Sequence, residues 1–306
     1  MNDEKAVRTD ETRWICLGTS GGPFQQSRAF QISNALTIGD DVYLFDVGNG
    51  VLRQLADAGI AFARIRAVFV THHHPDHIAD LGLVMLTHWL TPGESRVDIR
   101  GPVGTSHLVE GLTKSYAYTA LTSEDPRRRD IAGRFSVADA PQRSASLTEV
   151  YRDDNVVVET LDVEHFRSRG GWSGELPHAI GYRITTPDRV IAYTGDTGAS
   201  PLIGTLADGA DLLVSEVVSV DEIVSDLSTR FAAAPEVVER VAFNMRHNHI
   251  SPGEIGSLAR RANVGQVLLT HFVPLPAGDA EEELIRGVQA TAPGLQVHVA
   301  RDLGSY

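Results

Sequence analysis

Short apolar runs separated by glycine, proline and acidic residues recur along the chain. Runs of about four to eight apolar or alternating residues are typical of strands, whereas helices repeat their apolar positions every three or four residues. The runs that we expect to be strands are 15–17, 29–38, 42–45, 67–70, 97–100, 156–163, 179–185, 190–194, 212–216, 266–270 and 295–300. The segments with helical spacing are 51–58, 78–90, 107–116, 252–262 and 279–290, and 217–245 is mostly helical without clear ends.

Three connections have residues that indicate their form. Residues 18–23 are too glycine-rich for a regular element, and without a Walker lysine we interpret them as a tight turn. Residues 39–41 have the composition of a β-hairpin turn. Ser251 and Glu254 form the pattern of a capping box, with a proline at the first helical position, so they predict a helix start.

Two segments give no clear period. Residues 117–150 are polar and arginine-rich, and we interpret them as an inserted helical or loop excursion. This insertion could cover a substrate or form the contact of a homodimer, and the sequence does not choose between these roles. Residues 166–178 contain three glycines, so we expect a flexible loop in which Trp172 could act as an aromatic lid.

The composition is that of a globular protein without a membrane span. The chain has 306 residues, of which 42% are hydrophobic and 22% charged, and no apolar stretch approaches the roughly 18 residues that a span needs. The first fourteen residues are polar and lack the apolar segment of a secretory signal, so we expect a cytoplasmic location. Cys16 is the single cysteine, which excludes an internal disulfide and a thiolate metal cage.

The stretch richest in potential metal-binding side chains directly follows one of the expected strands. Residues 71–80 contain four histidines and two aspartates, and His72, His74, Asp76 and His77 form an HxHxDH pattern. Neutral imidazole and carboxylate are ligands for zinc and neighbouring first-row metals. Because alternate residues of an extended backbone point the same way, His72 and His74 can hold one ion, and Asp76 and His77 can face a second. The alternative is a solvated histidine-rich loop.

Three further candidate ligands each follow an expected strand directly. They are His165, Asp196 and His271. A metal ion in a protein needs three or four ligands, so the motif alone is not sufficient and the missing ligands should come from other strand ends. Each of the three, taken alone, could be an ordinary histidine or a turn aspartate. Together with the motif they give seven candidate ligands.

The motif and its surroundings resemble the metallo-β-lactamase-fold hydrolases. Besides HxHxDH, the resemblance rests on the entry stretches at residues 17–19 and 45–48, on the Gly-Asp-Thr that contains Asp196, and on the Leu-Thr-His that ends at His271. In that family the aspartate that matches Asp46 supports the metal loop by hydrogen bonding and does not bind the metal. We therefore expect the same supporting role for Asp46.

The resemblance also implies the fold. It is an α/β (α+β) fold, an αββα sandwich of two facing mixed β-sheets with helices outside. We expect a single domain over 1–306 with two halves, about 1–160 and 161–306, and with 117–150 as an insertion.

In this family the seven residues are divided between two ions. The resemblance assigns to the first ion His72, His74 and His165. It assigns to the second ion Asp76, His77 and His271, with Asp196 as the bridge. We expect two Zn²⁺, with Mn²⁺ or Fe²⁺ as alternatives, and a bridging hydroxide as the nucleophile.

The residues around His249 resemble the ribonuclease Z and arylsulfatase-like branch of the family. There the matching histidine is a general acid, oriented by a glutamate that matches Glu216. The alternative is a helix-entry histidine bonded to a cap. Since Asp76 can accept the proton of the attacking water, the expected catalytic residues are Asp76, His249 and Glu216.

The expected activity is hydrolysis of small anionic esters, either phosphodiesters or sulfate esters. A lactone or β-lactam hydrolase on the same di-zinc site is an alternative, although the His249 and Glu216 pair belongs to the phosphoesterase-like branch. An alternative of another class is a non-catalytic metal-binding scaffold, whose mark would be lost ligands. A redox di-iron relative would replace a histidine of the first site with a carboxylate. This chain keeps all seven ligand positions, which disfavours both.

Charge and segment length bear on the partner. The net charge is −13 at pH 7, so we do not expect long-range attraction to nucleic acid or to an anionic membrane. In ribonuclease Z the arm that clamps transfer RNA lies between the residues that match His165 and Asp196, and here only thirty residues separate them. The arginines between them are Arg167, Arg169, Arg183 and Arg189. We therefore expect a small-molecule substrate, no structured tRNA and no membrane.

Overall fold

Two facing β-sheets form the centre of the molecule in the computed structural model, which describes residues 11–91, 95–142, 144–166, 177–229 and 232–306. The first sheet consists, in spatial order, of β1 (Thr12–Gly18), β2 (Ser33–Ile38), β3 (Asp41–Val47), β4 (Ile65–Phe69), β5 (Val97–Gly101) and β6 (Phe135–Asp139). The second consists of β13 (Gln296–Val299), β12 (Gln266–Thr270), β11 (Leu212–Glu216), β10 (Val190–Tyr193), β9 (Ile180–Thr185), β8 (Val157–Asp162) and β7 (Thr148–Arg152).

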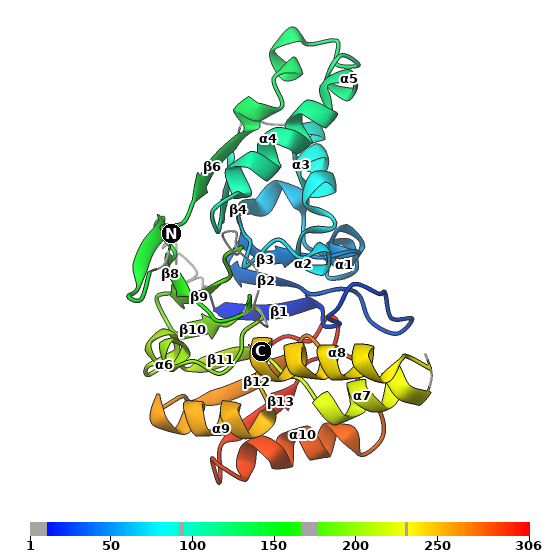
Figure 1. Ribbon diagram of the computed structural model, residues 1–306. Helices are drawn as coiled ribbons and strands as arrows, with labels where there is room; N and C mark the ends of the chain where they lie inside the picture. Colours follow the sequence, from blue (N-terminus) through cyan, green and yellow to red (C-terminus); the bar gives the residue numbers. More distant parts are fainter. Residues whose placement is uncertain (1–10, 92–94, 143, 167–176, 230–231) are drawn as a thin grey trace, which may run out of the picture.

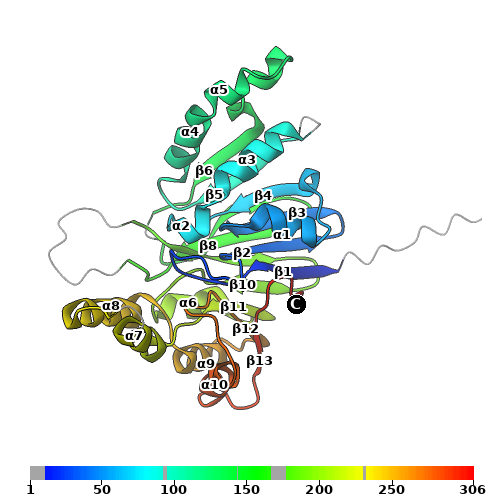
Figure 2. The same cartoon turned by 90° about the vertical axis from the view of Figure 1, so that its right-hand side faces the viewer.

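Helices cover the outer face of each sheet (Figures 1 and 2). Those of the first half are α1 (Val51–Asp57), α2 (Pro75–Ile78), α3 (Leu81–Leu90), α4 (Thr105–Ser115) and α5 (Ala117–Ala120), with the 3₁₀ turns η1 (Phe62–Arg64), η2 (Pro126–Arg129) and η3 (Ala132–Arg134). Those of the second half are α6 (Pro201–Ala207), α7 (Val220–Thr229), α8 (Pro235–Asn248), α9 (Pro252–Arg261) and α10 (Ala280–Gln289). The expected αββα sandwich of two mixed sheets is confirmed.

Each sheet joins an antiparallel part to a parallel part. Strands β1, β2 and β3 pair antiparallel, and β3 to β6 pair parallel. In the second sheet β7 to β10 pair antiparallel and β10 to β13 pair parallel. The parallel strands β10, β11 and β12 therefore end at the same edge of the second sheet, and loops leaving such an edge are where α/β proteins place chemistry.

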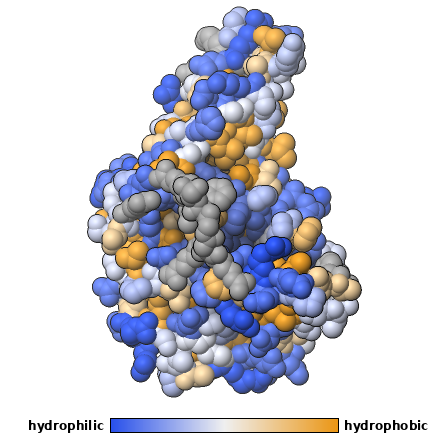
Figure 3. Space-filling model, in the orientation of Figure 1, coloured by the Kyte–Doolittle hydropathy of each residue, from blue (hydrophilic) through white to orange (hydrophobic). Residues whose placement is uncertain are grey.

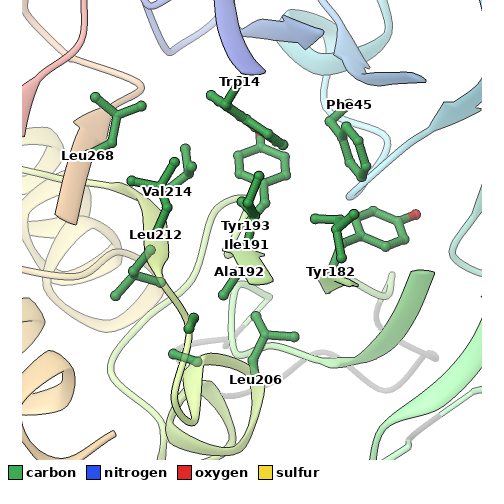
Figure 4. Packing of buried hydrophobic residues seen from close by; sticks show 14 of the residues in the cluster. Trp14, Phe45, Tyr182, Ile191, Ala192, Tyr193, Leu206, Leu212, Val214 and Leu268 are labelled. Carbon is green, nitrogen blue, oxygen red and sulfur yellow. The ribbon is translucent and has the colours of Figure 1, made fainter. Parts of the chain in front are cut away.

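Aromatic side chains fill the space between the sheets. Figure 4 shows Trp14, Phe45, Tyr182 and Tyr193 meeting there, and the rings of Phe45 and Phe69 stack with their centroids 4.8 Å apart. All of these side chains are buried. Because two of them are tyrosines, the core also brings hydroxyl groups to the edge where the functional loops begin.

The pattern of apolar residues missed several elements. The run 29–38 is a strand only from Ser33, and the expected helix 78–90 is two helices, because Asp80 leaves the helical conformation and its carboxylate accepts the Gly50 amide at 2.7 Å. We interpreted 117–150 as an excursion, but β6 lies within it and β7 begins in it, and these are edge strands of the two sheets. Edge strands are half exposed, so their apolar pattern is weak. Helix α6 was not expected either.

A projection stands out from the sandwich. Helices α4 and α5 extend away from it (Figure 1), and Figure 3 shows apolar side chains gathered where the projection leaves the body. Leu90 of α3 and Leu121 after α5 are each 62% exposed. Among the residues that the structure describes, we find no helix with the length and apolarity that crossing a membrane would require.

Candidate metal centre

The metal motif lies in the loop that leaves β4 and in the short helix α2. Pro75 begins α2, and Asp76 and His77 lie in its only turn, so the chain bends between the two halves of the motif. His72, Asp76 and His77 are buried, and His74 is more exposed than these three. The proline bend lets neighbouring residues of one loop face two different positions.

The remaining candidate ligands come from the facing sheet. His165 follows β8, Asp196 follows β10 and His271 follows β12, and all three are buried. His271 has a φ of 57°, a left-handed conformation that is costly for a histidine. Gly21 makes room for its ring, because a Cβ at that glycine would lie 2.3 Å from the His271 Cε1 atom.

Three imidazoles form the first cluster. The His74 Nδ1 atom lies 3.0 Å from His72 Nε2 and 3.1 Å from His165 Nε2. The Asp196 Oδ2 atom lies 3.8 Å from both of those Nε2 atoms. Four nitrogen and oxygen atoms thus surround one small volume.

The second cluster is built from two imidazoles and one carboxylate. His77 Nε2 and His271 Nε2 lie 3.2 Å apart, and Asp76 Oδ2 lies 3.2 Å from His271 Nε2. The Asp196 Oδ1 atom is 3.3 Å from both imidazole nitrogens. Asp196 therefore directs one carboxylate oxygen toward each cluster.

Hydrogen bonds on the far side of the rings fix which nitrogen faces inward. His77 Nδ1 lies 2.8 Å from Asp46 Oδ2, and His72 Nδ1 lies 3.1 Å from Thr71 Oγ1. His165 Nδ1 lies 2.9 Å from a backbone carbonyl oxygen. A ring that donates from Nδ1 to an acceptor keeps a lone pair on Nε2, as metal-binding histidines do.

Asp46 is held in place by hydrogen bonds from two separate segments of the chain. Its carboxylate accepts the Thr71 amide at 2.8 Å and the Tyr193 hydroxyl at 2.7 Å, and it has a φ of 56°. Thr71 and Tyr193 were not singled out in the sequence. Both are ordinary core or strand-end residues there, and only the fold brings them to the same carboxylate.

The electrostatics of the two clusters suit a divalent cation. Burial lowers the pKa of His165 to about 3 and the pKa of His72 well below its usual range, so these rings are neutral. Burial also opposes the charge on His77, but Asp196 and Asp46 outweigh it and raise the pKa of His77 well above its usual range. The buried carboxylates therefore stabilise positive charge at the second cluster. Without a metal, a proton on the His77 ring provides that charge.

The donor set passes a direct test of fit. Asp196 Oδ1 is buried and makes no hydrogen bond to any residue that the structure describes. The inward atoms are imidazole nitrogens and carboxylate oxygens, which are the donors that zinc, manganese and iron take in proteins. A His/Asp cluster of this composition indicates divalent metal binding.

His249 and Glu216 lie beside the clusters. The His249 Nδ1 atom is 2.7 Å from Glu216 Oε2, and the Thr197 amide donates to the other oxygen of Glu216 at 2.5 Å. Burial opposes a charge on His249, but Glu216 outweighs it and raises the pKa of His249 to about 9. The predicted capping box of Ser251 and Glu254 is confirmed, and it fixes the helix start just after His249.

A cavity of about 370 Å³ opens onto the clusters. His74, Asp76, Asp196, Glu216, His249 and His271 contribute its polar lining. Its apolar wall consists of Pro23, Val217, Val218, Met245 and Val273. This wall could not be predicted from local sequence patterns, because its residues come from four separate segments. Trp172, Arg167 and Arg169 lie outside the described residues.

Comparison with known proteins identifies relatives over almost the whole chain. The family described as Beta-lactamase superfamily domain matches residues 42–272. A ribonuclease Z of Mycobacterium sp. (strain KMS) is 30% identical over 296 residues, covering 94% of this chain and 93% of the relative. A ribonuclease Z of Mycobacterium bovis (strain BCG / Pasteur 1173P2) is 29% identical over 293 residues, covering 94% of this chain and 95% of the relative.

Solved structures share the fold at lower identity. The metallo-beta-lactamase fold protein YhfI from Bacillus subtilis superposes with a TM-score of 0.69 at 19% identity, covering 97% of this chain and 100% of that one. The short form of human tRNase Z superposes with a TM-score of 0.66 at 18% identity, covering 96% of this chain and 98% of that one.

These relatives correct our expectation about the partner. We expected a small-molecule substrate and no structured tRNA, and this is wrong, because the relatives that match nearly end to end are named ribonuclease Z. Net charge is a sum over the whole chain and does not describe the field at one site. The shortness of the segment between His165 and Asp196 was also a poor guide, since the relatives match over at least 93% of their length.

The sandwich, the paired clusters and the matches lead to one classification. The chain belongs to the β-lactamase superfamily, within which it is a metal-dependent hydrolase homologous to ribonuclease Z.

Proposed function

We propose that the chain is a phosphodiesterase that cleaves RNA with the help of two divalent cations. The observation that carries the proposal is the position of Asp196, whose two carboxylate oxygens face different clusters. Two ligand clusters that share one carboxylate suit a two-metal phosphodiesterase. The name ribonuclease Z, borne by relatives over nearly the whole chain, supports RNA as the substrate.

The proposed ligands follow the two clusters. One cation takes His72, His74 and His165. The other takes Asp76, His77 and His271, and Asp196 serves both. Zinc is the proposed metal, because imidazole and carboxylate are its usual ligands, and manganese or iron would accept the same set. When bound, such cations make water nucleophilic near neutral pH and neutralise charge that develops on a phosphate.

Asp76 and His249 are the proposed groups that move protons. Asp76 lines the cavity, and its Oδ2 atom is held by the Gly22 amide at 2.7 Å, so the carboxylate is positioned to accept a proton from the attacking water. His249 lines the same cavity. Because Glu216 outweighs the effect of burial and raises the pKa of His249 to about 9, the ring favours the protonated form that can donate to the leaving oxygen. Glu216 orients that ring through Nδ1, which leaves Nε2 to donate.

The charge of the cavity favours a diester over a monoester. Its lining, as far as the described residues give it, contains no lysine or arginine. The substrate's negative charge would therefore be balanced by the cations and His249 alone. A phosphodiester has one negative charge and a phosphomonoester close to two at pH 7, so the diester needs less compensation.

A panel of substrates tests this proposal. The zinc-loaded protein would be assayed with a tRNA precursor that has a 3′ trailer and with bis(p-nitrophenyl) phosphate. The comparison substrates are p-nitrophenyl phosphate, p-nitrophenyl sulfate, a lactone and a chromogenic cephalosporin. We expect cleavage of the RNA, and a higher kcat/KM for the diester than for the comparison substrates. Intact RNA, or faster hydrolysis of the sulfate or the cephalosporin, would contradict the proposed substrate class.

A further inference from the structure

Phe24 is an exposed aromatic side chain next to the cavity. Its side chain is 80% exposed, and it follows Gly22 and Pro23, both of which line the cavity. An exposed apolar residue needs no explanation by itself. Phe24 is of interest because it directly follows two residues that line the cavity at the metal centre.

The loop that bears Phe24 is fastened on both sides of it. Before Phe24, the Gly22 amide donates to Asp76 Oδ2 at 2.7 Å. After it, the Gln26 side-chain amide donates to the Phe272 carbonyl oxygen at 2.9 Å. The side-chain oxygen of Gln26 also accepts the amide of Leu275 at 2.9 Å. These anchors join the loop to the two segments that carry metal ligands, so Phe24 keeps a fixed place relative to the metal centre.

The other phenylalanine of this loop, Phe30, is less exposed than Phe24. Phe30 is 37% exposed, and its ring packs against Gly50, where an added Cβ would lie 2.0 Å from the Phe30 Cδ1 atom. The loop can therefore pack a phenylalanine against the body of the protein. Phe24 instead leaves most of its side chain exposed to solvent, directly after the cavity-lining Pro23.

We infer that Phe24 stacks against the base of a nucleotide that flanks the scissile phosphate. This inference rests on the proposed cleavage of RNA and adds to it a residue that binds the substrate. Unpaired bases are commonly recognised by stacking on aromatic side chains, and stacking accepts any base because every base has a π-face. A phenyl ring also adds no charge, so it would hold the strand without competing for the phosphate.

The test combines variants of Phe24 with RNA that lacks single bases. The substrate is a tRNA precursor in which each of the four nucleotides on either side of the cut is replaced in turn by an abasic nucleotide. The variants are Phe24→Ala, Phe24→Leu and Phe24→Tyr. The control is Tyr118→Ala, which removes an aromatic side chain that is 87% exposed on α5 of the projection.

We expect Phe24→Ala to raise KM for the intact RNA by roughly 5- to 150-fold, the range of base stacking on aromatic residues, with little change in kcat. Phe24→Leu should resemble it, because leucine keeps an apolar side chain but has no π-face, and Phe24→Tyr should restore KM. At one abasic position the wild type should show the same rise in KM, and Phe24→Ala should add nothing to it. Tyr118→Ala should leave KM unchanged.

Two results would overturn the inference in different ways. Suppose that the wild type cleaves the RNA but Phe24→Ala has the same KM for intact RNA as the wild type, or raises KM by the same factor for every abasic substrate. The stacking role is then wrong and the proposed function stands. If the wild type does not cleave the RNA at all, the proposed function and the stacking role fail together.

Discussion

His249 and Glu216 meet through a 2.7 Å contact between Nδ1 and Oε2, and both side chains line the cavity at the metal centre. The contact fixes the ring and leaves its other nitrogen to face a substrate. Neither residue is needed to complete the set of seven metal ligands that we propose. We therefore expect catalysis and metal binding to separate at this pair.

The variant His249→Ala should keep its metal content and lose rate. Proton transfer by a positioned histidine is worth roughly 10²- to 10⁴-fold, so kcat should fall by about that factor for RNA, whose leaving group is poor. The loss should be smaller for a p-nitrophenolate leaving group, which needs little protonation. Glu216→Gln should give a milder form of the same pattern. Loss of metal from His249→Ala, or an equal loss of rate for both leaving groups, would mean that the role is wrong.

The pH dependence of RNA cleavage should also reveal the role of His249. The pKa of His249 is raised to about 9, so the ring is protonated at neutral pH and loses its proton as the pH rises. Bound cations repel the protonated ring and lower its pKa. The rate of RNA cleavage should therefore fall with rising pH at or below about pH 9. In a pH profile of kcat, His249→Ala should lack this falling limb, whereas an unchanged limb in the variant would assign it to another group.

Asp196 and His165 should differ in their effect on metal binding. Asp196→Ala removes the carboxylate that faces both clusters, so both metal positions should weaken by more than roughly 100-fold, beyond what loss of an outer hydrogen-bonding partner costs. His165→Ala should weaken metal binding chiefly at one of the two positions. Competition with a chelator, followed by elemental analysis, measures the two affinities. His107→Ala, on the exposed surface of α4, is the matched control and should retain both metals. Selective loss of a single metal from Asp196→Ala would contradict the bridging role.

Gly21 should be intolerant of even a methyl group. In Gly21→Ala the new Cβ would lie 2.3 Å from the His271 ring, so the ring must move and the second cluster must open. We expect loss of one metal and a destabilisation of about 1–3 kcal/mol, typical of overpacking. Gly253→Ala in α9 is the control, because its Cβ meets nothing within 4 Å. Measuring the metal content and Tm of the two variants tests whether Gly21→Ala displaces the His271 ring. An unchanged metal content in Gly21→Ala would count against the proposed role of His271.

Much of the candidate site could be predicted because its signals are local. The HxHxDH motif lies within six residues. His165, Asp196 and His271 each follow an apolar run that predicts a strand. The resemblance to a known family then supplied the pairing of residues that lie far apart in sequence. Without that resemblance, nothing in the spacing would have placed Glu216 beside His249.

Other features depend on contacts that no single segment contains. The apolar wall of the cavity joins Pro23, Met245 and Val273 from three segments, and each is an ordinary apolar residue in its own stretch. The edge strands β6 and β7 were missed because an edge strand needs few apolar side chains. The partner was misjudged because net charge carries no information about position.

The number of metal ions per chain tests the central claim most directly. Metal-depleted protein would be titrated with zinc, and bound zinc and RNA cleavage would be measured in the same samples. Two positions that share Asp196 predict two zinc ions per chain, with full activity only after the second has bound. A reproducible ratio of one or less at full activity would contradict the account.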